Sequence, residues 1–297
     1  MRDPEPILLT GASGYVGSHL LDELLRRGRS VRALMREPAP GRLPAQVDAR
    51  KGDAVAGTGL AEALDGCRTA YYLIHSMGSG SGDAAGFARR DREAAVNFGE
   101  AARDAGVERV IYLGGLGDET TSEHLRSRHE VGELLRQRVP GLVYVRAAMV
   151  IGAGSASFEM LRHLTRRLPV MITPRWLNTR SQPVAIVDVA RALAALAELE
   201  EVPAEVQLGG ADVLSYREMI GRTASVMGRR GPLVMPVPLL TPRLSSHWVA
   251  LVTPVDIGLV RPLIDGLKEE MVVHTPPPPG VNDRPMGFDG AVREALA

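Results

Sequence analysis

The chain has 297 residues, of which 45% are hydrophobic, enough for one large domain or two small ones around a packed core. Its 35 basic residues balance 35 acidic ones, so no overall charge attracts nucleic acid or an anionic membrane. The single cysteine, Cys67, excludes an internal disulfide and a multi-cysteine metal site, and no metal is expected.

The apolar runs are all short. None approaches the ~20 residues that a membrane-spanning helix requires, and the stretch before the first glycine turn is too short for a signal peptide. We therefore expect a cytoplasmic protein without a stable membrane anchor. Its expected partner is a small-molecule substrate and not a nucleic acid, and the sequence is compatible with a monomer or a homodimer.

The first half alternates apolar runs with amphipathic stretches. The apolar runs predict buried strands at residues 6–11, 30–36, 69–76, 109–115 and 142–152, and the amphipathic stretches predict helices at 17–28 and 91–106. Strands that alternate with helices in this way predict an α/β fold, a Rossmann-like doubly wound parallel sheet with helices on both faces.

The second half is less regular. It predicts a helix at 158–169 and strand-then-helix units at 182–200 and 205–228, and the proline-rich chain from Gly231 predicts extended surface structure. Within it, the interrupted apolar stretch 245–267 predicts a lid or an interface helix pair. The expected division is a nucleotide-binding core of residues 1–152, on which 183–212 also packs, and a smaller C-terminal substrate or lid lobe of 153–182 and 213–297.

Glycines at positions 11, 14 and 17 follow the first strand and open the first helix, the context in which this spacing indicates a dinucleotide site. Gly11 would allow the tight turn, Gly14 the approach of a pyrophosphate, and Gly17 the packing of helix on strand. Amides at the helix N-terminus would meet the phosphates. The predicted phosphate-binding residues are Gly11, Ser13, Gly14, Tyr15, Val16 and Gly17. The alternative is a glycine-rich turn without a ligand.

The end of the second strand distinguishes the two nicotinamide cofactors. An acidic residue there would bind the adenosine ribose, whereas an arginine suits a 2'-phosphate. Arg36 occupies this position, which favours NADP(H) over NAD(H), although Glu37 follows directly. The alternative is a solvated loop arginine.

Two further strand ends face the same crevice, because ligands bind at the carboxyl edge of open α/β sheets. Asp53 and Ala54 end the third strand, where an adenine would lie. The fourth strand ends in Ile74, His75 and Ser76, for which we predict cofactor contact; for His75 the alternative is a polar residue that caps a strand.

Several motifs together resemble the atypical, extended-like short-chain dehydrogenase/reductases, especially the NmrA-like NAD(P)H-binding group. They are TGASGYVGSHL, VRALMREP, NFGEAARDAGVERVIYLGG, VDVARAL and LSYREM, and the likeness covers roughly residues 5 to 220. The resemblance implies the Rossmann-like fold and a nicotinamide cofactor.

The resemblance fails at the catalytic positions. Members that reduce carbonyls have a tyrosine four residues before a lysine on the helix after the fifth strand, but no tyrosine or lysine occurs between Tyr112 and Tyr144. The best register places His124 and Arg128 there. Gly114 and Gly115, which we also predict to bind the cofactor, fall where the family has a serine. His124 could donate a proton, whereas Arg128 could bind ribose hydroxyls but could not relay one. The alternative is that both are solvated helix residues.

Residues after the sixth strand are candidates for a substrate pocket, since a large ring among a few polar groups suits an organic ligand. The candidates are Met149, Phe158, Arg162 and Trp176; the alternative for the aromatic residues is a place in the core. Asp188 is expected to cap its helix and not to act as a base.

Three functions remain open. The first is an NADP(H)-dependent oxidoreductase that acts on a small hydrophobic carbonyl or unsaturated metabolite. The second is a non-catalytic NADP(H)-binding regulator or assembly factor, and the third an NAD(P)-dependent isomerase or epimerase.

Overall fold

The computed structural model describes residues 5–39, 41–75, 84–117, 123–167, 170–173, 175–231, 233–236 and 268–297. The predicted segment 245–267 and Ser76 lie outside these residues. The side chains of His124 and Trp176 also lie outside this description, although both residues have an assigned backbone.

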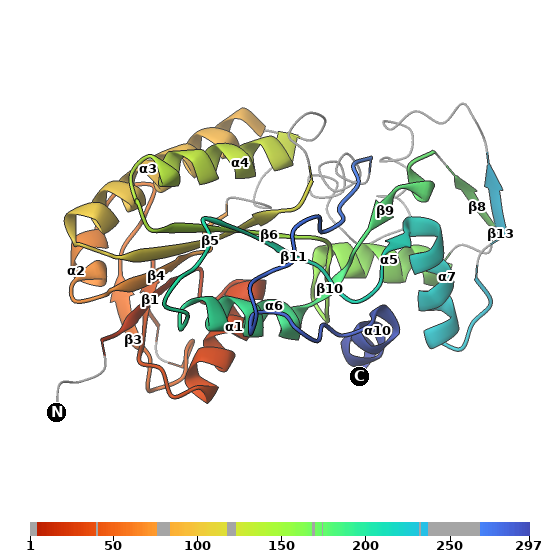
Figure 1. The fold of residues 1–297 in the computed structure, drawn as a ribbon, viewed down its shortest axis with the longest axis horizontal. Coiled ribbons are helices and arrows are strands. Elements are labelled where there is room, and N and C mark those ends of the chain that lie inside the picture. Colours follow the sequence, from red (N-terminus) through yellow and green to blue (C-terminus); the bar gives the residue numbers. More distant parts are fainter. Residues whose placement is uncertain are drawn as a thin grey trace.

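A seven-stranded parallel sheet, in the order β11-β6-β5-β4-β1-β2-β3, forms the centre of the larger part of the molecule (Figure 1). Its strands are β1 (Ile7–Thr10), β2 (Val31–Met35), β3 (Asp48–Lys51), β4 (Thr69–Tyr72), β5 (Arg109–Gly115), β6 (Leu142–Ala147) and β11 (Glu205–Leu208). From β1 the chain adds β2 and β3 on one side, and then returns to add β4 and the later strands on the other side of β1. This arrangement confirms the predicted Rossmann-like fold.

Helices cover both faces of the sheet, because successive strand residues point to opposite sides. Leu9 belongs to the core beneath α1 (Tyr15–Arg26) and α6 (Ile186–Leu196). Leu8 belongs to the core beneath α3 (Ala84–Asp104), α4 (Glu123–Arg136) and the short α2 (Leu60–Leu64). Figure 1 shows α3 and α4 on one side of the sheet and α1 and α6 on the other.

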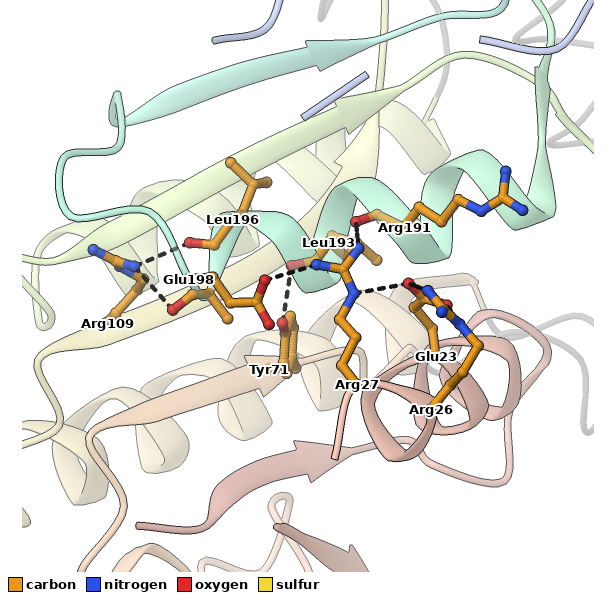
Figure 2. Close-up of polar contacts among 10 residues, drawn as sticks. Glu23, Arg26, Arg27, Tyr71, Arg109, Arg191, Leu193, Leu196 and Glu198 are labelled. Atoms are coloured by element: carbon orange, nitrogen blue, oxygen red, sulfur yellow. Dashed lines mark hydrogen bonds and ion pairs between the residues drawn. The ribbon is translucent and has the colours of Figure 1, made fainter. Parts of the chain in front are cut away.

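Polar contacts hold α6 against α1 and the sheet, although α6 lies far along the chain (Figure 2). The Tyr71 hydroxyl of β4 donates to the Leu193 carbonyl of α6 at 2.9 Å. The Arg27 guanidinium bridges Glu23 and Glu198, each at 2.8 Å. The two helices therefore form one layer.

A second apolar core unites α5 (Ala156–Arg167), α7 (Tyr216–Val226) and α10 (Phe288–Leu296). Around it are three short strand pairs, β7 (Val150–Ile151) with β10 (Val184–Ala185), β9 (Arg180–Ser181) with β12 (Leu214–Ser215), and β8 (Val170–Thr173) with β13 (Leu233–Pro236). A short helix, η1 (Arg175–Asn178), precedes β9.

Three elements differ from the sequence predictions. The run 142–152 is two strands, because the chain leaves β5 and β11 after Ala147 and pairs with β10 instead. β4 ends at Tyr72 and does not continue to residue 76. The C-terminus is not all extended, because Phe288, Ala291 and Val292 lie on one face of a helix and pack on α7.

Candidate cofactor and active site

The glycine turn between β1 and α1 has the predicted geometry. Gly11 has φ +69°, and a Cβ there would lie 2.8 Å from the Leu73 carbonyl oxygen. A Cβ on Gly17 would lie only 2.0 Å from the Gly11 oxygen. Both positions therefore require glycine, and the turn brings the N-terminus of α1 to the carboxyl edge of the sheet.

The cradle above this turn is open. Gly14 is exposed, and a Cβ at this position would meet only the Gly11 oxygen, at 3.1 Å. The first backbone bond of α1 runs from Ser18 to the Gly14 oxygen, so the amides of Tyr15, Val16 and Gly17 have no acceptor within the helix. These amides and the exposed Ser13 fit an anionic group such as a pyrophosphate.

Thr10 holds the neighbouring strand end in place, a role that the sequence analysis missed. Its hydroxyl donates to the Tyr71 carbonyl at 3.0 Å and accepts from the Leu73 amide at 2.9 Å. It therefore replaces the main-chain pairing between β1 and β4 where β4 ends. The only sequence signal was its position directly before Gly11.

The predicted adenosine side lies at the ends of β2 and β3. Arg36 is exposed directly after β2, and its side chain makes no hydrogen bond or ion pair within the described part of the chain. Asp53 accepts from the Val55 amide at 2.8 Å, and Asn97 of α3 donates to the Ala54 carbonyl at 3.0 Å. Asp53 and Ala54 thus belong to a loop whose conformation is fixed from within and from α3.

His75 stands just beyond β4, beside a carboxylate that the sequence analysis did not select. Its Nδ1 lies 3.1 Å from Oδ2 of Asp91 on α3, and the Asp91 side chain is 6% exposed. Burial, and secondly the positive charge of Arg128, lower the pKa of His75 to about 4 despite the opposing effect of Asp91. Ile74, also predicted to contact the cofactor, is half-buried beside it.

Arg128 points back from α4 to the same edge. Its Nη1 donates to the Leu113 carbonyl of β5 at 2.8 Å, beyond the last pairing of β4 with β5. Its Nε is buried and has no acceptor among the described residues. A buried N–H without an acceptor is costly, so this position suits a ligand oxygen.

Gly114 and Gly115 do not form an open cradle where the family has a serine. A Cβ on Gly114 would lie 2.5 Å from the Tyr144 ring, and one on Gly115 would lie 2.6 Å from the Leu125 side chain. Both glycines thus make room for neighbouring side chains.

A further network, which no sequence pattern indicated, fixes the loop after β5. The Gly117 carbonyl lies 3.2 Å from Nε2 of His129 and accepts from the Arg146 guanidinium at 2.5 Å. His129 Nδ1 lies 3.2 Å from the Tyr144 hydroxyl. His129 belongs to α4, so the network links Gly117, just after β5, to the helix that carries His124 and Arg128.

The predicted pocket residues lie in different environments. Phe158 is completely buried in the second apolar core, as the alternative interpretation of the sequence predicted. Met149 packs at the edge of that core, and Arg162 pairs with Glu159 at 2.6 Å. Asp188 is not the N-cap of α6, which is Ala185; it lies in the first turn and accepts from the Met286 amide at 2.7 Å.

Tyr15 connects the glycine turn to Gly152, directly after β7. A Cβ on Gly152 would lie 2.2 Å from the Tyr15 hydroxyl, so that glycine gives the ring its space. Burial, and secondly the charge of Glu159, raise the pKa of Tyr15 to about 12. The hydroxyl is thus a neutral donor close to the predicted phosphate loop.

A hollow of about 840 Å³ lies at the opposite, amino edge of the sheet. Its arginines are engaged already, because Arg68 pairs with Glu108 at 2.5 Å and Arg109 donates to the Leu199 carbonyl at 2.7 Å. Among the described residues, no group of His, Cys, Asp and Glu could hold a metal ion, and no helix is long and apolar enough to cross a membrane.

These features are typical of a dinucleotide site at the carboxyl edge of a Rossmann-like sheet. Residues 11–148 match the family model of NAD(P)H-binding domains. The resemblance to the atypical short-chain dehydrogenase/reductases is confirmed at the level of this domain and of the fold.

Three known proteins show how far the similarity extends. A ceramide reductase of Caulobacter vibrioides is 28% identical over 267 residues, 85% of this chain and 81% of that protein. The Citrobacter sp. triphenylmethane reductase, solved with NADP(H), superposes with a TM-score of 0.75 at 18% identity and covers 98% of this chain and 100% of its own. A Staphylococcus aureus nucleoside-diphosphate-sugar epimerase gives 0.77 at 19% identity, with 97% and 100% covered. The two structures share the fold of this chain.

Proposed function

We propose that this protein is an NADP(H)-dependent oxidoreductase that acts on a small hydrophobic carbonyl or unsaturated metabolite. The observation that carries the proposal is the pair of donors on either side of the sheet edge. The α1 amides suit the pyrophosphate, and the buried Nε–H of Arg128 suits a ribose hydroxyl. The similarity to a reductase along 85% of the chain supports redox chemistry.

The residues of this chain bind and orient, while a bound nicotinamide would supply or accept the hydride. Arg128 is a fixed cation that holds ribose oxygens, and Arg36, exposed at the end of β2, has its side chain available for a 2'-phosphate. The sequence register makes His124 a candidate for the proton. Met149, Arg162 and Trp176 remain candidate substrate residues, and the division into residues 1–152 with 183–212 and the smaller lobe stays a prediction.

Cofactor titration tests whether the protein prefers NADP(H) to NAD(H). We expect NADPH to bind more tightly than NADH in calorimetry, and Arg36→Ala to reduce the NADPH affinity by 10-fold or more, since charge-assisted bonds contribute about 1.5–3 kcal/mol. The same variant should leave the NADH affinity unchanged. Equal affinities of the parent protein for both cofactors would remove the NADP(H) preference.

Turnover distinguishes the oxidoreductase from a non-catalytic regulator. The absence of the family's tyrosine and lysine favours the regulator. NADPH consumption, or NADP+ reduction in the reverse direction, should appear with a member of a panel that contains a ceramide and other hydrophobic ketones and secondary alcohols. Tight cofactor binding without turnover on any of them would instead support the regulator or assembly factor. An epimerase would interconvert a sugar nucleotide without net cofactor turnover.

A further inference from the structure

The C-terminal part of the chain returns to the carboxyl edge of the sheet at Met271. The Met271 amide donates to the Arg180 carbonyl at 3.0 Å, and the Met271 carbonyl accepts from the Gln182 amide at 2.8 Å. Two residues further, Val273 packs where β11 ends, since a Cβ on Gly209 would lie 2.8 Å from its Cγ2. The segment runs alongside β9 and β11 (Figure 1). The backbone of Met271 is therefore fixed in place.

The Met271 side chain lies against the backbone just beyond β5. Gly117 has φ +127°, a conformation that residues with a side chain rarely adopt. A Cβ there would lie 3.8 Å from Cγ of Met271 and 3.2 Å from Cδ1 of Leu125. Leu125 directly follows His124 in the first turn of α4 and is buried, whereas Met271 is only half-buried. Met271 is thus an apolar side chain that stays accessible beside the start of α4.

This place belongs to the nicotinamide end of the predicted dinucleotide site. The predicted adenosine side lies at the ends of β2 and β3, and the predicted pyrophosphate site lies at the start of α1, directly after β1. The sheet continues from β1 to β4, β5 and β6, so the other half of an extended dinucleotide would lie over β4 and β5. A substrate that exchanges hydride with the nicotinamide would lie next to it, by the loop after β5 that Met271 contacts.

We propose that Met271 is a specificity-determining residue that contacts the apolar substituent on the substrate carbonyl. The inference rests on the proposed oxidoreductase function and names one wall of its substrate site. A methionine side chain is apolar and has three rotatable bonds, so it packs well against apolar groups of irregular shape. Because the backbone of Met271 is held by two hydrogen bonds, the length of its side chain sets the room that remains for the substituent.

A pair of substrates of different size tests the contact. The first is the panel member on which the parent protein turns over, and in the second its apolar substituent is longer by about three heavy atoms, as many as Met271→Ala removes. The variant should lower kcat/KM for the first and raise it for the second. The ratio of the two should change by about 10-fold or more, the usual effect of a methylene in an apolar pocket. A general loss of structure would instead lower both values together.

Met227→Ala is the matched control. Met227 is also half-buried, but it lies at the C-cap of α7, and its replacement should leave the ratio unchanged. Both variants should bind NADPH as the parent protein does, because Met271 is expected to face the substrate and not the cofactor.

Methyl NMR of labelled methionine gives a readout besides activity. The ε-methyl signal of Met271, assigned by its loss in Met271→Ala, should shift when the ketone is added to the protein with NADP+, a complex that cannot react. The signal of Met227 should not shift.

The outcomes separate this proposal from the function on which it rests. Parent protein that binds NADPH but turns over no panel member removes both. In a protein that turns over, an unchanged ratio in Met271→Ala removes only the role of Met271, and so does a methyl signal that the ketone leaves in place. If Met271→Ala does not fold, by circular dichroism and NADPH binding, Met271→Gln decides. Its polar chain has the same length and should lower kcat/KM by about 10-fold for the apolar substrate, relative to an analogue with a hydroxyl on that substituent.

Discussion

At the level of single residues, position 17 requires glycine because a backbone atom of the preceding turn lies close to it. Its Cβ would lie 2.0 Å from the Gly11 oxygen, and this oxygen cannot move without displacing the glycine turn. Gly221 of α7 is the matched opposite, because it is exposed and a Cβ there would meet nothing within 4 Å.

We therefore expect Gly17→Ala to lower the free energy of unfolding by about 3 kcal/mol, the upper range for overpacking, and to weaken NADPH binding. Gly221→Ala should raise it by about 0.5–1 kcal/mol, since alanine is the better helix former. Urea unfolding of the three proteins measures both changes. Equal stability of Gly17→Ala and the parent would show that the turn adapts more freely than its geometry indicates.

At the level of elements, Glu23 pairs with Arg26 and Arg27 at the end of α1 (Figure 2). Arg27 in turn donates to the Arg191 carbonyl of α6. Hydrogen bonds from Arg26, followed by those from Arg27, lower the pKa of Glu23 from 4.5 to about 2 against the effect of burial. A carboxyl with a lowered pKa stabilises the folded state above its unfolded pKa and loses that effect as the pH falls.

Glu23→Gln should thus be less stable than the parent protein at pH 7, and the difference should shrink as the pH falls from 4.5 towards 2. Denaturant unfolding at a series of pH values measures this difference. Glu62→Gln, an exposed position on α2, provides the control and should show little difference at any pH. A difference that persists unchanged at low pH would mean that packing, and not charge, accounts for the effect of Glu23.

At the level of the whole molecule, the C-terminal segment returns to parts of the chain 98 and 76 residues earlier. The buried Asp188 of α6 accepts from the Met286 amide at 2.7 Å, and Asp212 accepts from the Phe288 amide at the same distance. Phe288 then enters the core of α5 and α7. The segment thus connects the α6 layer of the sheet to the second apolar core.

Asp188→Ala should leave that amide without its acceptor and lower the free energy of unfolding by about 1–3 kcal/mol. Limited proteolysis should cut the C-terminal segment faster, since the attachment opens locally before the whole protein unfolds. Asp104→Ala removes only an exposed pair with Arg103 and should change neither quantity. Unchanged proteolysis of Asp188→Ala would show that the core contacts of α10 hold the segment alone.

Local patterns explain what could be predicted from the sequence. The alternation of apolar runs and amphipathic stretches is enough to define a parallel sheet, and the glycine spacing depends on atoms within six residues of one another. The α10 helix was missed although its apolar residues have helical spacing, because the proline-rich stretch before it favoured an extended chain.

By itself, the sequence determined the fold class, the edge of the sheet that is predicted to bind a nicotinamide dinucleotide, and the absence of the family's tyrosine and lysine. Only the tertiary structure decided which side chains meet there. Asp91 and Arg128 lie 16 and 53 residues from His75 and approach it from separate helices. Their meeting depends on how α3 and α4 pack on the sheet, and no local pattern of residues encodes that packing.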